Sequence, residues 1–154
     1  MKAAIIDSFD RLNAGVATVF LLTVRVFWGW QFAETGWGKL HHLARVTQFF
    51  SSLGIPLPAL TAALVGTLEF AGGIFLILGL ASRFWALLLC LNMLIAYITD
   101  GSAQLLSVFS DPGKFYGYDA FPFLFAALVI LCFGPGRIAL DRIVVPQIRR
   151  LCFT

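Results

Sequence analysis

The sequence predicts an all-α integral membrane protein: a four-helix bundle with an interfacial helix after the first crossing and a basic cytoplasmic C-terminal tail. Of the 154 residues, 60% are hydrophobic and only 12% are charged, and the mean hydropathy is +0.90. A soluble domain has about 25% charged and 45–50% apolar residues. The apolar residues also gather into four runs. The first two reach the length of about 20 residues that a membrane crossing needs, and the last two are short for it, so their ends must include less apolar residues. We therefore expect lipid, and not water, to surround most of the surface.

The four apolar runs predict the crossings of a single domain that covers residues 1–154. The expected spans are about 14–38, 59–80, 84–104 and 120–134. Breakers separate them: Pro56 and Pro58 precede the second run, and the GPG at 134–136 ends the fourth. Backbone groups in lipid must bond within their own segment, so each run is expected to be a helix. Two aspartates interrupt the first 15 residues, so we expect the first crossing itself, and no cleavable leader, to direct insertion.

Two connections and the C-terminus carry further patterns. The segment 40–53 has apolar residues at near-helical spacing, which predicts a helix lying in the membrane interface. The aromatic residues of the loop 100–119 are expected to act as interface anchors. The segment after Gly136 is basic and partly apolar, and we expect it to lie against the inner leaflet.

The distribution of basic residues predicts the orientation. With four crossings, one side would hold seven Lys or Arg residues: Lys2, Arg11, Arg83, Arg137, Arg142, Arg149 and Arg150. The other side would hold three: Lys39, Arg45 and Lys114. Because basic loops stay in the cytoplasm, both termini are expected there. The basic residues form no patch interleaved with aromatic residues, so no nucleic-acid partner is expected.

Charged residues inside the apolar runs are the strongest functional signal. Arg25 lies near the middle of the first run and Glu69 near the middle of the second, each about eleven residues in. An unpaired charge at the bilayer centre costs roughly 2.5–3.5 kcal/mol on insertion scales. We therefore predict that Arg25 faces Glu69, with Asn92 of the third run as a further hydrogen-bond partner. Gly66, Gly72 and Gly73 would let the first two helices approach closely.

Two interpretations of this cluster remain open. It could be a structural clamp that fixes helix packing, or it could line a cavity for a quinone, a thiol compound or another small anion. Lys39 shares a face of the first helix with Arg25.

A second set of polar residues lies near the outer end of the first helix. Glu34 lies off the helix face that carries Arg25 and is closer to His41 and His42. Adjacent histidines cannot chelate a metal as an i, i+4 pair would, so we favour interfacial polarity over a metal or heme site and predict no metal. The three cysteines are widely spaced and form no CxxC pair, so no disulfide framework is expected.

The order of several short motifs is similar to one known family. Arg25 is followed by GWGKL at 36–40, LGIPLP at 53–58, LEFAGGIFLILGLASR at 68–83 and GPGRIALD at 134–141. Over about residues 16–140 this pattern resembles the DoxX family of small bacterial four-helix membrane proteins. The resemblance places the family's polar signature on Arg25, Lys39 and Glu69. It implies a location in the bacterial inner membrane and a link to oxidoreductase chemistry, since relatives include a membrane subunit of a thiosulfate:quinone oxidoreductase.

The resemblance leaves the activity open between classes. The leading hypothesis is a membrane subunit of a redox or respiratory system, with Arg25, Glu69, Asn92 and Lys39 lining an intramembrane pocket for a quinone-like or small anionic ligand. The alternative is a non-catalytic accessory subunit of a larger respiratory or photosynthetic electron-transfer complex. A membrane chaperone is a third, weaker reading. No intrinsic cofactor is predicted beyond a bound quinone, and the expected partners are lipid and other membrane subunits; the sequence leaves self-association undecided.

Overall fold

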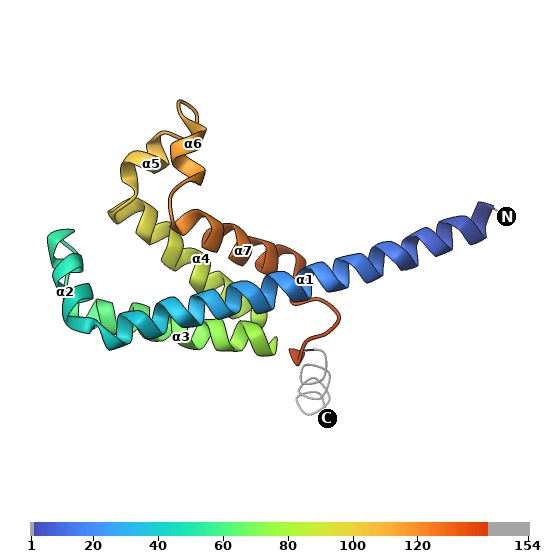
Figure 1. Ribbon diagram of the computed structural model, residues 1–154, viewed down its shortest axis with the longest axis horizontal. Helices are drawn as coiled ribbons and strands as arrows, with labels where there is room; N and C mark the ends of the chain where they lie inside the picture. The colour runs from blue at the N-terminus through green and yellow to red at the C-terminus, as the bar shows by residue number, and fades with distance from the viewer. Residues whose placement is uncertain (1, 142–154) are drawn as a thin grey trace, which may run out of the picture.

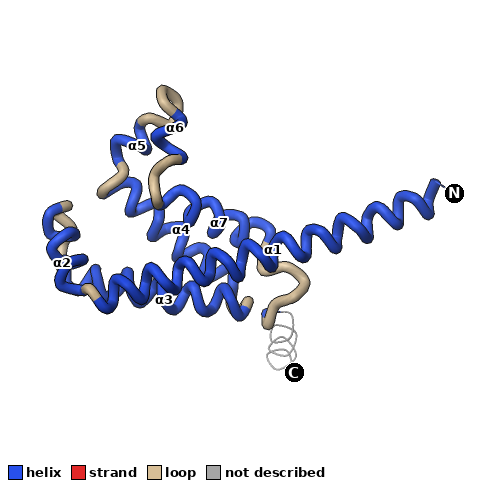
Figure 2. The backbone as a smooth tube through the Cα atoms, in the orientation of Figure 1, coloured by secondary structure: helices blue, strands red, loops and turns tan. Residues whose placement is uncertain are grey.

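The computed structural model describes the backbone of residues 2–141 and the side chains of residues 12–141, and in this part of the chain it contains helices and no strand (Figures 1 and 2). The helices are α1 (Lys2–His41), α2 (Leu43–Ser52), α3 (Pro58–Leu78), α4 (Ser82–Thr99), α5 (Ser102–Leu106), α6 (Pro112–Tyr116) and α7 (Ala120–Phe133). The predicted all-α membrane fold is confirmed. Most of the basic tail predicted after Gly136 lies outside the described residues.

Three helices of the described chain are long and apolar enough to cross a membrane: α1 from Leu12, α3 and α4. The fourth member of the bundle, α7, has 14 residues and a length of about 21 Å. This is shorter than the hydrocarbon core of about 30 Å, so its ends must rely on local thinning or on covering elements.

Helix α1 is much longer than the predicted first crossing. Its 40 residues extend over about 60 Å. Only the C-terminal half runs beside α3; the residues before it first pass the loop after α7, and the N-terminal end projects away from the bundle (Figure 1). Its apolar side chains Val16, Val19 and Phe20 are exposed, which suits contact with lipid tails.

Glycines bring α1 and α3 into backbone contact. A Cβ atom on Gly36 would lie 2.7 Å from the carbonyl oxygen of Gly66, and one on Gly29 would lie 2.9 Å from that of Gly73. No side chain could occupy these positions without moving a helix. Small residues are the usual means of close helix approach in membranes, where the hydrophobic effect contributes little to association.

The second helix pair is α4 with α7, and it contributes most of the apolar core. Leu89, Tyr97, Ala127 and Ile130 are fully buried between them, together with Phe32 of α1. Helix α4 ends at Thr99, because the chain turns at Gly101 before the short helix α5. The third predicted span, 84–104, therefore extended about five residues too far at its C-terminal end.

The connection after the first crossing forms the predicted amphipathic helix. Helix α2 packs on α3 and lies across the end of the α1–α3 pair (Figure 1). Phe49 stays exposed, and none of its residues is fully buried. Such a helix suits the boundary between lipid and water.

Asp141, the last described residue, is hydrogen-bonded to the start of α4. Its carboxylate oxygens accept hydrogen bonds from the backbone N–H of Ala81 (2.6 Å) and of Ser82 (3.0 Å). Its own N–H donates to the carbonyl oxygen of Gly79 (2.9 Å). The first N–H groups of a helix have no partner within the helix. Asp141 therefore serves as the N-terminal cap of α4, although it lies 59 residues after Ser82.

Replacing Asp141 by alanine should therefore lower the free energy of unfolding by about 1–2 kcal/mol, the usual effect of losing an N-terminal cap. Reversible unfolding of the purified protein in mixed micelles would measure this. Asp119→Ala is the matched control, because Asp119 occupies the N-cap position of α7 and makes no capping hydrogen bond there. Equal effects of the two substitutions would contradict the capping role.

Candidate functional site

Three polar side chains meet between α1, α3 and α4. Lys39 Nζ forms an ion pair with Glu69 Oε2, and Asn92 Nδ2 donates a hydrogen bond of 2.9 Å to Glu69 Oε1. Glu69 is 2% exposed, whereas the Lys39 side chain is 30% exposed. Both carboxylate oxygens of Glu69 thus have a partner, and the negative charge is neutralised inside the bundle. We refer to Lys39, Glu69 and Asn92 as the polar cluster.

Arg25 does not belong to the polar cluster, and the prediction that it faces Glu69 is wrong. It is buried at the opposite end of the α1–α3 pair, where its guanidinium donates a hydrogen bond of 2.6 Å to the carbonyl oxygen of Pro135 and lies beside Gly79. The reason is the length of α1. Because its N-terminal half projects beyond α3, Arg25 lies level with the end of α3, and Lys39 is the residue that reaches Glu69.

Two adjoining cavities lie next to the polar cluster, and Lys39 is part of the wall of both. We describe them as lying above the cluster. They have volumes of about 380 Å³ and 340 Å³. Both are lined by Lys39, Phe49, Ala96, Asp100 and Tyr118. Asn92 lines the first, together with apolar residues of the α2–α3 connection such as Leu53 and Ile55. The Lys39 ammonium has three N–H donors, so it can bind Glu69 and still donate into the cavities.

Tyr118 and Asp100 form the rim of these cavities. Tyr118 Oη donates a hydrogen bond of 2.7 Å to Asp100 Oδ2. Burial, and then this hydrogen bond to the carboxylate, raise the pKa of Tyr118 well above its usual value, so the phenol keeps its proton at any physiological pH. The sequence pattern predicted interface anchors in this loop and did not indicate a place for Tyr118 on a cavity wall. Only the fold of α5 and α6 over the end of α4 brings it there.

The second predicted set of polar residues does not converge on one point. Glu34 lies on the outside of α1, and His41 lies on the same face about 10 Å along the helix axis. His41 stacks on Trp37, with ring centroids 4.0 Å apart, and its Nδ1 contacts the Trp37 carbonyl oxygen. His42 stands at the break between α1 and α2. Within the described part of the chain, no three His, Cys, Asp or Glu side chains come together as a metal site would require.

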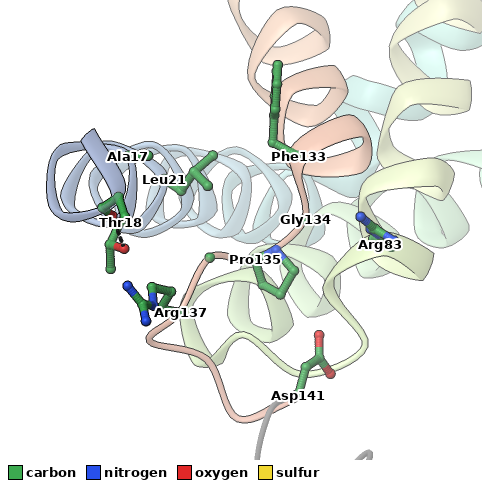
Figure 3. A pocket seen from close by; sticks show the side chains of 11 residues that line it. Ala17, Thr18, Leu21, Arg83, Phe133, Gly134, Pro135, Arg137 and Asp141 are labelled. Carbon is green, nitrogen blue, oxygen red and sulfur yellow. Dashed lines mark hydrogen bonds between the residues drawn. The ribbon is translucent and has the colours of Figure 1, made fainter. Parts of the chain in front are cut away.

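A cavity of about 900 Å³ lies at the other end of the bundle, near Arg25. Figure 3 shows it between α1, which contributes Thr18 and Leu21, and the loop through Pro135. Arg83 and Arg137 stand on opposite sides of this loop. The polar cluster does not line this cavity. The bundle thus has two different ends. Arg25, Arg83 and Arg137 lie at one of them, which we call the basic end, and the polar cluster and its two cavities lie toward the other.

The comparisons with known proteins identify one family and one curated relative. The model of the DoxX family matches residues 20–100, a range that includes the polar cluster and excludes Tyr118 and Asp141. A protein of Bacillus subtilis (strain 168) with the name "Putative oxidoreductase CatD" is 35% identical over 78 residues. That match covers 51% of this chain and 57% of the relative, so it spans little more than half of either protein. No solved structure matches the chain.

Proposed function

Since the chain belongs to the DoxX family and spans the membrane with apolar helices, we propose that it is a membrane subunit of a redox system that binds a quinone-like ligand above the polar cluster. The observation that carries this proposal is the position of Lys39. Its ammonium group is held by a buried carboxylate on one side and lines two apolar-walled cavities on the other. The name of the Bacillus subtilis relative supports a redox role.

The residues at this site fit a quinone. The carbonyl oxygens of a quinone accept hydrogen bonds, and Lys39 and Asn92 offer N–H donors from the cavity wall. Phe49, Phe50 and Ile95 supply apolar surface for a ring and an apolar tail. A bound quinone would supply two-electron, two-proton chemistry. The chain's own residues would orient it, exclude water around it and hold donors against its oxygens.

A small anion fits the same site less well. Glu69 already neutralises the charge of Lys39, and Asp100 adds a carboxylate to the wall of both cavities. An anion entering there would meet a net negative surface. A neutral hydrogen-bond acceptor would meet no such repulsion, so the charge balance favours a quinone over an anion.

The proposal includes a location and an orientation. The chain would lie in the bacterial inner membrane with both termini in the cytoplasm, as the distribution of basic residues predicts. The polar cluster is near the end of α1 that carries α2, so the cavities would open toward the outer leaflet. Arg25, Arg83 and Arg137 would then be at the cytoplasmic end.

Filling the cavities tests the proposal. Ala96 lines both of them, so Ala96→Phe should weaken the binding of a short-chain benzoquinone at least tenfold while leaving the polar cluster in place. Titration calorimetry of the protein in mild detergent would measure the affinity. Ala17→Phe is the matched control, because it adds the same side chain to the cavity at the basic end. Equal affinity of wild type and Ala96→Phe would contradict the proposed site.

The accessory-subunit alternative predicts a different result. Purification from native membranes would then recover the chain at a fixed ratio with cofactor-bearing subunits, and mass spectrometry would find no quinone on the chain alone. In that case the polar cluster would serve only to hold α1, α3 and α4 together.

A further inference from the structure

Glu34 is a carboxylate on the outside of a membrane-spanning helix. It is exposed, while its helical neighbours Phe32 and Gly36 are buried against the rest of the bundle. Charged residues within membrane spans almost always face the bundle interior or a water-filled cavity and pair there. Glu34 makes no ion pair or hydrogen bond with any described residue. Its position therefore needs an explanation that the bundle alone does not provide.

The depth of Glu34 makes this exposure costly. Gly36, two residues away, contacts the backbone of Gly66 and Phe70 in the middle of α3. Phe70 is about 18 Å along the axis from the start of α3 and about 12 Å from its end. Ala33, the direct neighbour of Glu34, lies against Gly73, which is about 8 Å along the axis from the end of α3. Glu34 thus lies inside the span, nearer to the C-terminal end of α3. The carboxylate is too short to reach water from there, unlike the long side chains of lysine and arginine.

Aromatic side chains surround Glu34 on the same face. Trp30 and Trp37 precede and follow it by about one helical turn, and they are 63% and 52% exposed. With Ala33 and Phe70 they line a cavity of about 370 Å³ that includes Glu34. The rings of Trp37 and Phe70 lie with their centroids 5.4 Å apart. His41 stacks on Trp37 as well, whereas Trp30 makes no ring contact with a described residue and is the more exposed of the two. A carboxylate beside an exposed indole is an arrangement that recognises organic cations, through charge and through cation–π attraction.

Among the described residues, no lysine or arginine lines this site, and the nearest ionisable ring, His41, stacks on Trp37 and contacts the Trp37 carbonyl oxygen. Lys39 is paired with Glu69, and Arg25 is buried and bonded to Pro135. A second copy packed symmetrically on this face would bring a second Glu34 to the same depth, and two like charges there would repel each other. We therefore propose that Glu34, Trp30, Trp37 and Phe70 form a membrane-facing binding site for a lipophilic organic cation. This site is separate from the cavities above the polar cluster and opens toward lipid.

Binding of tetraphenylphosphonium to the protein in mild detergent tests this inference. We expect saturable binding at one site per chain, accompanied by a change in tryptophan fluorescence. Glu34→Gln removes the charge with little change in shape and should weaken binding at least tenfold, and Trp37→Leu should weaken it several-fold. Asp111→Asn is the matched control, because it removes the same charge from an exposed loop that lies outside this site and should leave the affinity unchanged.

The results that would overturn the inference are distinct from those for the quinone. Equal binding by wild type and Glu34→Gln would mean that the cation merely partitions into the micelle. Absence of binding, together with a cross-link between copies or to another subunit through a cysteine at position 34, would assign the face to a protein partner instead. Ala96→Phe should leave tetraphenylphosphonium binding intact, so either site can fail without the other.

Discussion

Gly36→Ala should separate α1 from α3 and lower the free energy of unfolding by about 3 kcal/mol. The added methyl group would press on the backbone nitrogen of Phe70 and lie 2.7 Å from the Gly66 carbonyl oxygen. Overpacking usually costs about 1–3 kcal/mol. The upper end applies here because the contacted atoms belong to a helix backbone, which cannot rotate away as a side chain can.

Gly38→Ala is the control for this experiment. Gly38 lies two residues further along the same helix, and a Cβ atom there would meet nothing within 4 Å. Alanine has the higher helix propensity by about 1 kcal/mol, so the control should be neutral or slightly stabilising. Unfolding of both variants in mixed micelles would give the comparison. Equal stability of the two would show that α1 and α3 are not in backbone contact at Gly36.

Lys39→Met should destabilise the bundle by about 3 kcal/mol. Removal of one partner from a buried ion pair leaves the other charge without compensation, which typically costs 3–5 kcal/mol. Glu69 would retain only its hydrogen bond from Asn92. The lower end of that range is expected, because the Lys39 side chain is 30% exposed and the pair is therefore only partly buried.

Two further variants sharpen this prediction. Glu69→Gln should cost less than Lys39→Met, because the partly exposed Lys39 can extend its ammonium into the cavities when its partner is removed. Lys114→Met removes the same charge from an exposed pair with Asp111, 3.4 Å apart, and should change stability by less than about 0.5 kcal/mol. If Lys39→Met matched Lys114→Met in an unfolding experiment, the pair with Glu69 would contribute nothing to the fold.

The candidate site shows that counting residues along the sequence does not give the relative depth of two residues in the membrane. Counting residues within each apolar run placed Arg25 and Glu69 at equal depth. That count assumes that both helices begin at the same membrane boundary, whereas α1 continues far beyond the start of its apolar run. The glycine contacts define the true register, since Gly36 meets Phe70 and Gly29 meets Gly73. Lys39 was found in the sequence only through the family resemblance and through the helix face that it shares with Arg25.

Other parts of the site had weaker signals. Asn92 was identifiable because an amide in the centre of an apolar run needs a partner, and it does bind Glu69. Asp141 was visible only as the last residue of GPGRIALD, with nothing to connect it to the start of α4. For Tyr118, the sequence indicated only the general preference of aromatic residues for the membrane interface.

The sequence by itself determined the class of this protein, because composition and the lengths of apolar runs settle which solvent surrounds the chain and which backbone structure that solvent permits. It also determined which residues are too polar for their surroundings. Only the tertiary structure decided which of them meet: Glu69 binds Lys39 and Asn92, Arg25 binds the Pro135 carbonyl, and Glu34 faces outward. The physical reason is that pairing depends on the axial register of two helices. That register is set by glycine contacts between backbones, and hydrophobic periodicity carries no information about it.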